Sequence, residues 1–273
     1  MHSRTDIAAL LSEHGLAPRR DLGQNFVVDA NTVRKIARLA DVGPSDHVVE
    51  IGAGLGSLTL ALAETGATIT AIEVDRGVAG ALRTVVAGLA NVTVIEDDAM
   101  RLDWTALLAS APQWVLVANL PYNVATPLVC DLLDLVPAVQ RMLVMVQREV
   151  AERLCAPAGA DAYGAASVKV AYWATARIVA SVPASVFVPR PNVESALADI
   201  RRRPSPAVDV PPEPLFQLVR TAFGQRRKML RRSLVDVVDA AVFDAAGVDS
   251  KRRPEELDIV EWGALTSAWL AAT

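Results

Sequence analysis

The chain has 273 residues, of which 52% are apolar and 21% are charged, and its formal net charge is −4 at pH 7. This composition is typical of a soluble globular protein with one large and one smaller domain, and it excludes a disordered chain. Two cysteines, Cys130 and Cys155, are too few for a disulfide framework or a zinc site, which favours the cytoplasm. Because acidic residues interrupt the apolar stretches, we expect neither a membrane span nor a signal peptide.

Apolar runs alternate with helical periodicities through the first 154 residues. The apolar spacing predicts a helix over 31–41 with Asn31 as its N-cap, and a strand that passes into a helix over 141–154. Between these two segments the predicted strands are 46–54, 68–75, 91–100 and 113–122, and the predicted helices are 57–66, 76–88 and 126–136. This alternation predicts a doubly wound, mostly parallel α/β sheet with helices on both faces.

Four of the predicted strands end in a glycine or a polar residue. These residues are Gly52, Glu73, Asp98 and Asn119. Parallel sheets bind ligands at the carboxyl ends of their strands. One polar residue there is an ordinary loop residue, but four in series indicate a site.

The chain changes character at the proline- and arginine-rich stretch 201–214, after which no strand is predicted. We therefore predict a first domain over 1–200, a linker over 201–214 and a small helical domain over 215–273. Residues 201–253 carry 12 Lys and Arg against 6 Asp and Glu. This local excess of positive charge indicates either a contact with a polyanion or a solvated helical surface.

A glycine-rich turn follows the first strand of the predicted sheet, just after Glu50. Its glycines at 52, 54 and 56 have the spacing G-x-G-x-G. A dinucleotide-binding turn needs its third glycine at position 57, which is Ser57, and no P-loop lysine follows. Glycines let a backbone approach a ligand closely, but a turn that only packs a helix on a strand has the same composition.

The acids at the next two strand ends favour a nucleoside ligand. Glu73 lies about 20 residues beyond the turn, where a carboxylate can accept both hydroxyls of a ribose. Asp98 lies in reach of the exocyclic amine of an adenine. A ribose and an adenine without a phosphate-binding device indicate S-adenosylmethionine. The segments VVEIGAGLGSLT, AIEVD and EDDA resemble the class I S-adenosylmethionine-dependent methyltransferases, which implies a Rossmann-like fold and cofactor contacts from Gly52, Gly54, Glu73 and Asp98.

The tetrapeptide Asn119-Leu120-Pro121-Tyr122 fits methyl transfer to an amine. The exocyclic nitrogen of adenine is a poor nucleophile because its lone pair is delocalised into the ring. The side-chain oxygen of Asn119 and the carbonyl of Leu120 or Pro121 can accept its two N–H bonds and stabilise the charge that develops. Tyr122 can stack on the base. Taken alone, the tetrapeptide is also typical of a turn that begins a helix.

The Asn-Leu-Pro-Tyr form resembles the ribosomal RNA adenine N6-dimethyltransferases. DLGQNFVVD (21–29) resembles the N-terminal element of that family, within the first 30 residues here, which closes over the cofactor. This likeness implies that Asn25, Val27 and also Asn119 contact the cofactor. VFVPRPNVESA resembles the loop that places Phe187 against the target base, opposite Tyr122. Without this resemblance, core packing is an alternative for both rings.

The basic segment AFGQRRKMLRRSL (222–234) resembles the basic helix of the family's C-terminal domain. It implies RNA contacts from Arg226, Arg227, Lys228 and Arg231. Together with QREVAERL and AYGAASV, it favours the bacterial 16S rRNA branch. The chain departs from the commonest family pattern at Asp21, Ala53 and Gly224, and of these Asp21 puts a local RNA contact in doubt.

The resemblance spans residues 17–260. It implies a cytoplasmic, monomeric enzyme that uses S-adenosylmethionine, with S-adenosylhomocysteine as product, to dimethylate N6 of two adjacent adenosines near the 3′ end of 16S rRNA in a 30S pre-ribosomal particle. A 23S rRNA adenine methyltransferase of the macrolide-resistance type and a non-catalytic RNA-binding assembly factor remain alternatives. His2, His14 and His47 lack ligand spacing, so we expect no metal and no histidine base.

Overall fold

The computed structural model describes residues 1–19, 22–121 and 124–273, which cluster into two compact units. Unit 1 comprises Met1–Ala151 and Arg177–Arg201, and unit 2 comprises Glu152–Ala176 and Arg202–Thr273. Their helices and strands, in chain order, are α1 (Arg4–Glu13), β1 (Phe26–Val27), α2 (Ala30–Ala40), β2 (His47–Ile51), α3 (Ser57–Ala63), β3 (Thr68–Glu73), α4 (Arg76–Val86), β4 (Val92–Glu96), α5 (Trp104–Leu107), β5 (Trp114–Asn119), α6 (Ala125–Leu135), β6 (Val139–Gln147), α7 (Arg148–Cys155), α8 (Ala165–Trp173), β7 (Ala174–Val182), β8 (Phe187–Val188), β9 (Ser195–Arg202), α9 (Pro212–Gly224), α10 (Leu230–Ser233), α11 (Ala240–Ala246) and α12 (Ile259–Ala272). Within these described residues, no helix is long and apolar enough to cross a membrane.

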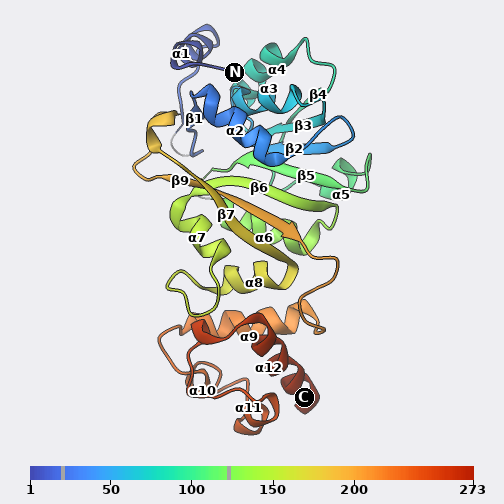
Figure 1. Ribbon diagram of the computed structural model, residues 1–273, viewed down its shortest axis with the longest axis vertical. Helices are drawn as coiled ribbons and strands as arrows, with labels where there is room; N and C mark the ends of the chain where they lie inside the picture. Colours follow the sequence, from blue (N-terminus) through green and yellow to red (C-terminus); the bar gives the residue numbers. More distant parts are fainter. Residues whose placement is uncertain (20–21, 122–123) are drawn as a thin grey trace. The chain divides into compact units, whose positions relative to one another are not determined.

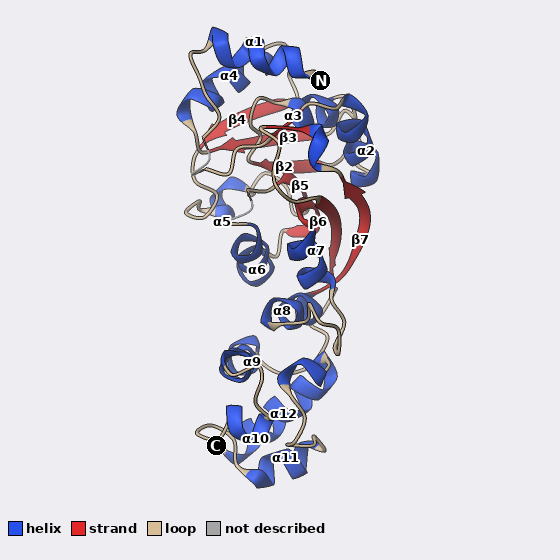
Figure 2. Ribbon diagram, turned by 90° about the vertical axis from the view of Figure 1, so that its left-hand side faces the viewer, coloured by secondary structure: helices blue, strands red, loops and turns tan. Residues whose placement is uncertain are grey.

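A seven-stranded sheet forms the centre of unit 1, in the order β4-β3-β2-β5-β6-β9-β7. The strands from β4 to β6 are parallel, and β9 pairs antiparallel with β6. Helices lie on both faces of the sheet (Figures 1 and 2). These five parallel strands are the ones that the sequence predicts, so the doubly wound, mostly parallel α/β fold is confirmed. Leu116 and Val117 in β5 have no exposed surface, as expected of a strand covered on both faces.

The sequence pattern missed several elements of unit 1. Helix α1 begins with a capping box between Ser3 and Asp6, and its buried Ile7 packs against Phe26. Strands β1 and β8 form a separate two-stranded antiparallel sheet. The predicted N-cap of α2 was wrong: Asp29 caps this helix by accepting a hydrogen bond from the N–H of Thr32, while the predicted cap lies inside the helix.

Unit 2 is helical, and it includes a segment that the sequence assigned to the first domain. Residues 152–176 cluster with the C-terminal helices because Tyr163 and Tyr172 are buried in one apolar core with Trp262. Their hydroxyls donate to the carbonyls of Leu257 and Val210. The predicted linker 201–214 also differs, since β9 extends into its start and α9 begins before its end.

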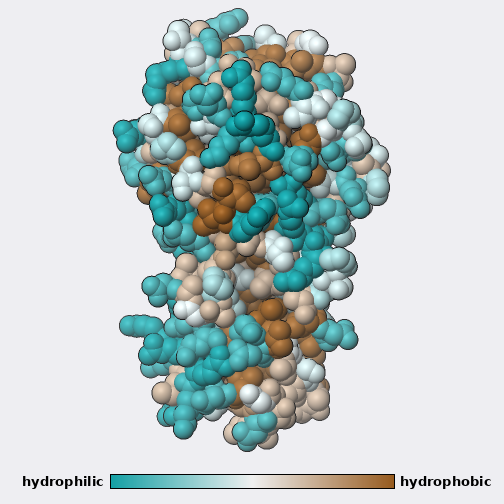
Figure 3. Space-filling view, in the orientation of Figure 1, coloured by the Kyte–Doolittle hydropathy of each residue, from teal (hydrophilic) through white to brown (hydrophobic). Residues whose placement is uncertain are grey.

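The basic residues that we predicted on one helix over 222–234 lie mainly in a turn, so this prediction was wrong. Helix α9 ends at Gly224, and the N–H of Lys228 donates to the carbonyl of Gln225. The chain then turns because the N–H of Leu230, whose side chain is fully buried, donates to the carbonyl of Arg252. Hydrophilic side chains gather over α10 on the face that Figure 3 shows.

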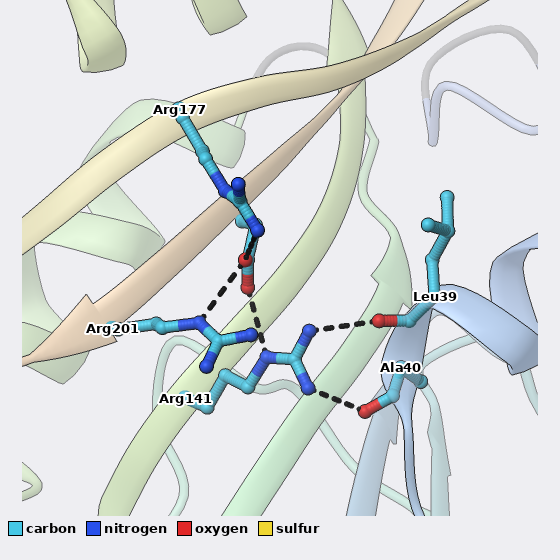
Figure 4. Close-up of polar contacts among 6 residues, drawn as sticks. Leu39, Ala40, Arg141, Arg177 and Arg201 are labelled. Carbon is cyan, nitrogen blue, oxygen red and sulfur yellow. Dashed lines mark hydrogen bonds and ion pairs between the residues drawn. The ribbon is translucent and has the colours of Figure 1, made fainter.

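One buried ion pair connects helix α2 to the sheet in unit 1 (Figure 4). Arg141 in β6 donates through Nε to the buried carboxylate of Asp199 in β9, at 2.8 Å. Its other two nitrogens donate to the carbonyls of Leu39 and Ala40, both at 2.7 Å, at the end of α2. A guanidinium there satisfies carbonyls that have no partner within the helix. Arg177 and Arg201 reach the second oxygen of Asp199 from more exposed positions.

We expect Arg141→Met to lower the free energy of unfolding by about 3 kcal/mol, because it leaves two helix carbonyls and Oδ1 of the buried Asp199 without the donor they share. Arg177→Met is the matched control. It removes an arginine from the same carboxylate, but that arginine is 71% exposed, and the expected loss is below about 1 kcal/mol. Urea unfolding of both variants measures the difference. Equal losses would contradict the assignment of the connection to Arg141.

Candidate active site

A cavity lies at the carboxyl ends of β2, β3 and β5, and the N-terminal segment 22–27 forms part of its wall. Most residues predicted to act together line it, namely Asn25, Val27, Gly52, Gly54, Glu73, Asn119, Leu120 and Pro121. A second cavity shares Leu22, Gly52, Val74 and Pro121 with the first and is also lined by Asp98. The two cavities thus bring together predicted residues from five separate stretches of the sequence.

The glycine turn needs its glycines for both backbone conformation and space. Gly52, Gly54 and Gly56 have φ of +69°, +58° and +85°, a region that residues with a Cβ rarely adopt. A Cβ on Gly54 would lie 3.2 Å from the ring of Phe26, and one on Gly56 would lie 2.8 Å from Cδ1 of Leu82. Gly56 therefore serves packing, whereas Gly52 and Gly54 form the cavity wall.

Glu73 is buried at the end of β3, and its carboxylate holds the backbone around it. Oε2 accepts the N–H of Gly54 at 2.8 Å, and Oε1 accepts the N–H of Asp75 at 3.0 Å. Burial raises the pKa of Glu73, although the two N–H donors favour the ionised form. Each carboxylate oxygen has a second lone pair, so the same group can still accept a ligand hydroxyl.

Glu50 is a cavity residue that the sequence reasoning noticed but did not assign. Its side chain is 2% exposed, and Oε2 has no hydrogen-bond partner among the described residues. Burial raises the pKa of Glu50 to about 8, the nearby hydroxyl of Thr59 opposes this shift, and the Glu73 carboxylate adds to it. An unpartnered buried acid is costly, and such groups concentrate at functional sites. Its position two residues before the first glycine of the turn was the available signal.

Asp98 lies beyond the end of β4 and lines the second cavity. Its Oδ1 accepts the N–H of Met100 at 3.0 Å, and Oδ2 lies 3.7 Å from Nε of Arg101. These local contacts fix the direction of the carboxylate. Leu22 and Val74 provide apolar surface in the same cavity, which suits a flat ring held at its edge by a polar group.

Asn119 is the last residue of β5, and its amide points to the N-terminal segment. Nδ2 donates to the carbonyl of Asn25 at 3.1 Å. The next residue, Leu120, is buried and donates its N–H to the carbonyl of Met145. The carbonyl of Pro121 accepts the N–H of Val124 at 3.2 Å. The predicted stacking residue Tyr122 lies outside the described residues.

The N-terminal segment is fixed on both sides of Asn25. The hydroxyl of Ser57 donates to the carbonyl of Val27, and the N–H of Val28 donates to the carbonyl of Val186. On the other side, Nε2 of Gln24 donates to Asp75 at 3.3 Å. Sequence reasoning did not assign Gln24, although it lies in the quoted GQNF stretch.

Phe187 does not line the cavity. Its side chain has no exposed surface and belongs to the apolar core that contains Val27 and Val182. Phe187 pairs with Val27 in the β1–β8 ladder. A stacking role for Phe187 therefore stays a prediction, and it requires the ring to leave this core position.

The family model described as ribosomal RNA adenine dimethylase matches residues 15–268. A relative from Bifidobacterium adolescentis, named ribosomal RNA small subunit methyltransferase A, is 44% identical over 96% of this chain and 92% of its own length. Proteins of the same name from Thermobifida fusca and Moorella thermoacetica are 45% and 42% identical, over 95% and 94% of this chain and 93% and 94% of their own lengths.

Two solved structures have a similar fold. The 23S rRNA methyltransferase ErmE aligns with a TM-score of 0.70 at 24% identity, over 89% of this chain and 98% of its own. A dimethyladenosine transferase from Plasmodium falciparum aligns with a TM-score of 0.76 at 23% identity, over 88% of this chain and 95% of its own. At these identities the likeness extends to the fold alone.

The raised pKa of Glu50 predicts a pH-dependent loss of stability. In the unfolded chain this carboxyl ionises near its ordinary pKa of 4.5, whereas in the folded chain it stays protonated up to about 8. The folded chain then binds more protons, so the stability that Glu50 contributes is complete below about pH 4.5 and is lost as the pH rises toward 8. The difference in free energy of unfolding between Glu50→Gln and the wild type should therefore grow in favour of the variant, by on the order of 1 kcal/mol per pH unit in this range. Urea unfolding at several pH values measures this, and parallel pH profiles would contradict it.

Proposed function

The chain belongs to the ribosomal RNA adenine dimethylase family, and we propose that it dimethylates N6 of two adjacent adenosines near the 3′ end of 16S rRNA with S-adenosylmethionine. The observation that carries the proposal is the meeting of the glycine turn, Glu73 and Asn119 in one cavity. The full-length similarity to proteins named small subunit methyltransferase A supports the 16S substrate over the 23S alternative. We also propose that the enzyme is a cytoplasmic monomer and that its substrate is the RNA within a 30S pre-ribosomal particle.

The cavity residues fit S-adenosylmethionine. Glu73 would accept the ribose hydroxyls, and Asp98 would accept the adenine amine in the second cavity, between apolar side chains. The glycine turn leaves space for the methionine part at Gly52 and Gly54, and the segment at Asn25 and Val27 would close over it. Oε2 of Glu50, which has no hydrogen-bond partner among the described residues, supports a polar or cationic group of the ligand nearby. When bound, this cofactor supplies an electrophilic methyl group on a sulfonium.

Asn119 and Leu120 would act on the target amine. Oδ1 of Asn119 would accept one N–H, and a backbone carbonyl would accept the other. The carbonyl of Pro121 already accepts the N–H of Val124, so we assign this role to the carbonyl of Leu120. Both acceptors stabilise positive charge as the nitrogen forms its new bond, and they act most strongly in the transition state. Tyr122 would hold the ring by stacking, and Phe187 would join it after leaving its core position.

RNA contacts in unit 2 would come from the basic turn. Arg227 and Lys228 are exposed in the turn between α9 and α10, and Arg231 is exposed in the first turn of α10. Arg226 is partly committed within the unit, since it donates to the carbonyl of Asp161 at 2.8 Å and lies 3.7 Å from the carboxylate of Glu255. We therefore assign phosphate contacts mainly to the other three. Such contacts orient the RNA but carry little sequence information.

The proposal is tested with radiolabelled S-adenosylmethionine and under-methylated ribosomal particles. We expect label in 16S rRNA and a primer-extension stop at two adjacent adenosines near its 3′ end. Label in 23S rRNA would favour the macrolide-resistance type of activity. RNA binding without any label would favour a non-catalytic assembly factor.

Asn119→Ala should abolish methyl transfer, because the variant loses the side-chain acceptor for the target amine. Affinity for the cofactor should stay within about tenfold of the wild type, or about 1.4 kcal/mol. Transfer assays and calorimetric titration with S-adenosylhomocysteine measure the two quantities. Wild-type turnover in this variant would rule out the assigned role.

Reversing the charges of Arg227 and Lys228 to glutamate should weaken RNA binding, most strongly at low salt, because phosphate contacts release counterions. Filter binding over a series of salt concentrations measures the effect. Reversing the exposed Arg34 and Lys35 in α2 changes the net charge of the chain equally and is the control. An identical loss in both double variants would mean that net charge, and not the turn, governs binding.

A further inference from the structure

We propose that Gln24 is a positioning residue: its hydrogen bond to Asp75 fixes the carbonyl of Asn25, and that carbonyl holds the amide of Asn119 with its oxygen toward the target base. This inference rests on the proposed function, which makes Asn119 the acceptor for the adenine amine. It assigns the N-terminal segment a part in orienting a catalytic group, in addition to closing over the cofactor.

The orientation of the Asn119 amide follows from its partner. A carbonyl oxygen only accepts, so the atom of Asn119 that faces the carbonyl of Asn25 at 3.1 Å must be the amide nitrogen. The amide oxygen then faces away from Asn25 and can accept from the target amine. Without this contact the amide can turn over, which would place N–H donors opposite the N–H donors of adenine.

Gln24 fixes the segment directly before Asn25, and both ends of its side chain are used. Nε2 donates to the carboxylate of Asp75 at 3.3 Å, and Oε1 accepts the N–H of Arg19 at 2.8 Å. Within the described residues, the side chain of Asn25 makes a local bond, to the carbonyl of Gly23. Gln24 therefore connects this part of the segment to Asp75 by a hydrogen bond, and the guanidinium of Arg19 lies 3.7 Å from the same carboxylate oxygen.

Asp75 is a rigid partner for Gln24. Its Oδ1 caps α4 by accepting the N–H groups of Gly77 and Val78. Its own N–H donates to Oε1 of Glu73 at 3.0 Å. A continuous series of contacts thus leads from Glu73 in the cavity, through Asp75 and Gln24, to the carbonyl that holds Asn119.

The residues after Asn25 have their own contacts and do not depend on Gln24. The carbonyl of Val27 accepts from Ser57, and Val28 is bonded to Val186. Loss of the Gln24 contact should therefore release the Asn25 carbonyl without releasing the whole segment. This predicts a loss of the methyl-transfer rate with cofactor binding largely kept.

The test uses the full-length protein and an exchange of donor and acceptor. In Gln24→Glu the carboxylate still accepts from Arg19 but faces the carboxylate of Asp75 without a proton to donate. Adding Asp75→Asn restores a donor, while the asparagine oxygen can still cap α4. Gln140→Glu, which makes the same chemical change at an exposed position in β6, is the control.

Three quantities are measured: the methyl-transfer rate at saturating S-adenosylmethionine, the Kd for S-adenosylhomocysteine, and hydrogen exchange of the peptide spanning 22–28. For Gln24→Glu we expect the rate to fall to about one tenth of the wild-type rate or below, which is the loss typical of one hydrogen bond to a charged group. The Kd should stay within about threefold of the wild-type value, and hydrogen exchange of the peptide should be faster. The double variant should recover the rate and slow exchange, and the Gln140→Glu control should match the wild type.

Two results would overturn the proposal. If Gln24→Glu keeps the wild-type rate at saturating S-adenosylmethionine and only its Kd for the cofactor product rises, Gln24 binds the cofactor and does not position Asn119. If the double variant stays as slow as Gln24→Glu, the contact with Asp75 is not what matters. The exchange measurement needs no RNA, so it tests the contact separately from the proposed function. If the wild-type protein methylates no rRNA but exchange is faster in Gln24→Glu and slower again in the double variant, the proposed function is refuted and the contact between Gln24 and Asp75 is supported.

Discussion

The buried carboxylate of Glu73 is the interaction on which the site geometry depends. It joins the glycine turn, through the N–H of Gly54, to the start of α4, through the N–H of Asp75. These two backbone segments follow neighbouring parallel strands, which end at the same edge of the sheet. Of these two N–H groups, that of Gly54 belongs to the turn, whose glycines have left-handed conformations. The cavity wall, the helix cap and the proposed ribose acceptor therefore form one connected structure.

Burial at this edge has an electrostatic cost that a ligand would reduce. Two acids, Glu50 and Glu73, lie in the same cavity, and burial raises the pKa of both. Glu73 has backbone donors that favour its ionised form, whereas Oε2 of Glu50 has no partner in the part of the chain that the structure describes. A protein optimised for stability alone would place apolar side chains here. The cost is understandable if the cavity receives a ligand with hydroxyl groups and a positive charge, which is what S-adenosylmethionine offers.

The two units would have different roles in the proposed reaction, because their exposed side chains differ in chemistry. Unit 1 contains the cavity and the residues that would contact the reacting atoms. Unit 2 has an apolar core of aromatic and aliphatic side chains and an exposed basic turn. A turn held by backbone hydrogen bonds on one side can present several cations without burying them. Its contribution would be salt-dependent affinity, while selection of the target base depends on the cavity.

The parallel sheet, the glycine turn and the acids at the strand ends could be predicted from the sequence, because they follow from apolar periodicity and from residue types at fixed positions along each strand. The bond between Asn119 and Asn25, 94 residues apart, and the burial of Phe187 beside Val27 could not, because they arise from the packing of distant segments. The tertiary structure also placed the basic residues in a turn and residues 152–176 in unit 2. Local sequence patterns predict which face of a helix or strand is buried. They do not predict which distant carbonyl, side chain or core that face will contact, because these contacts depend on hydrogen bonds and packing between distant segments.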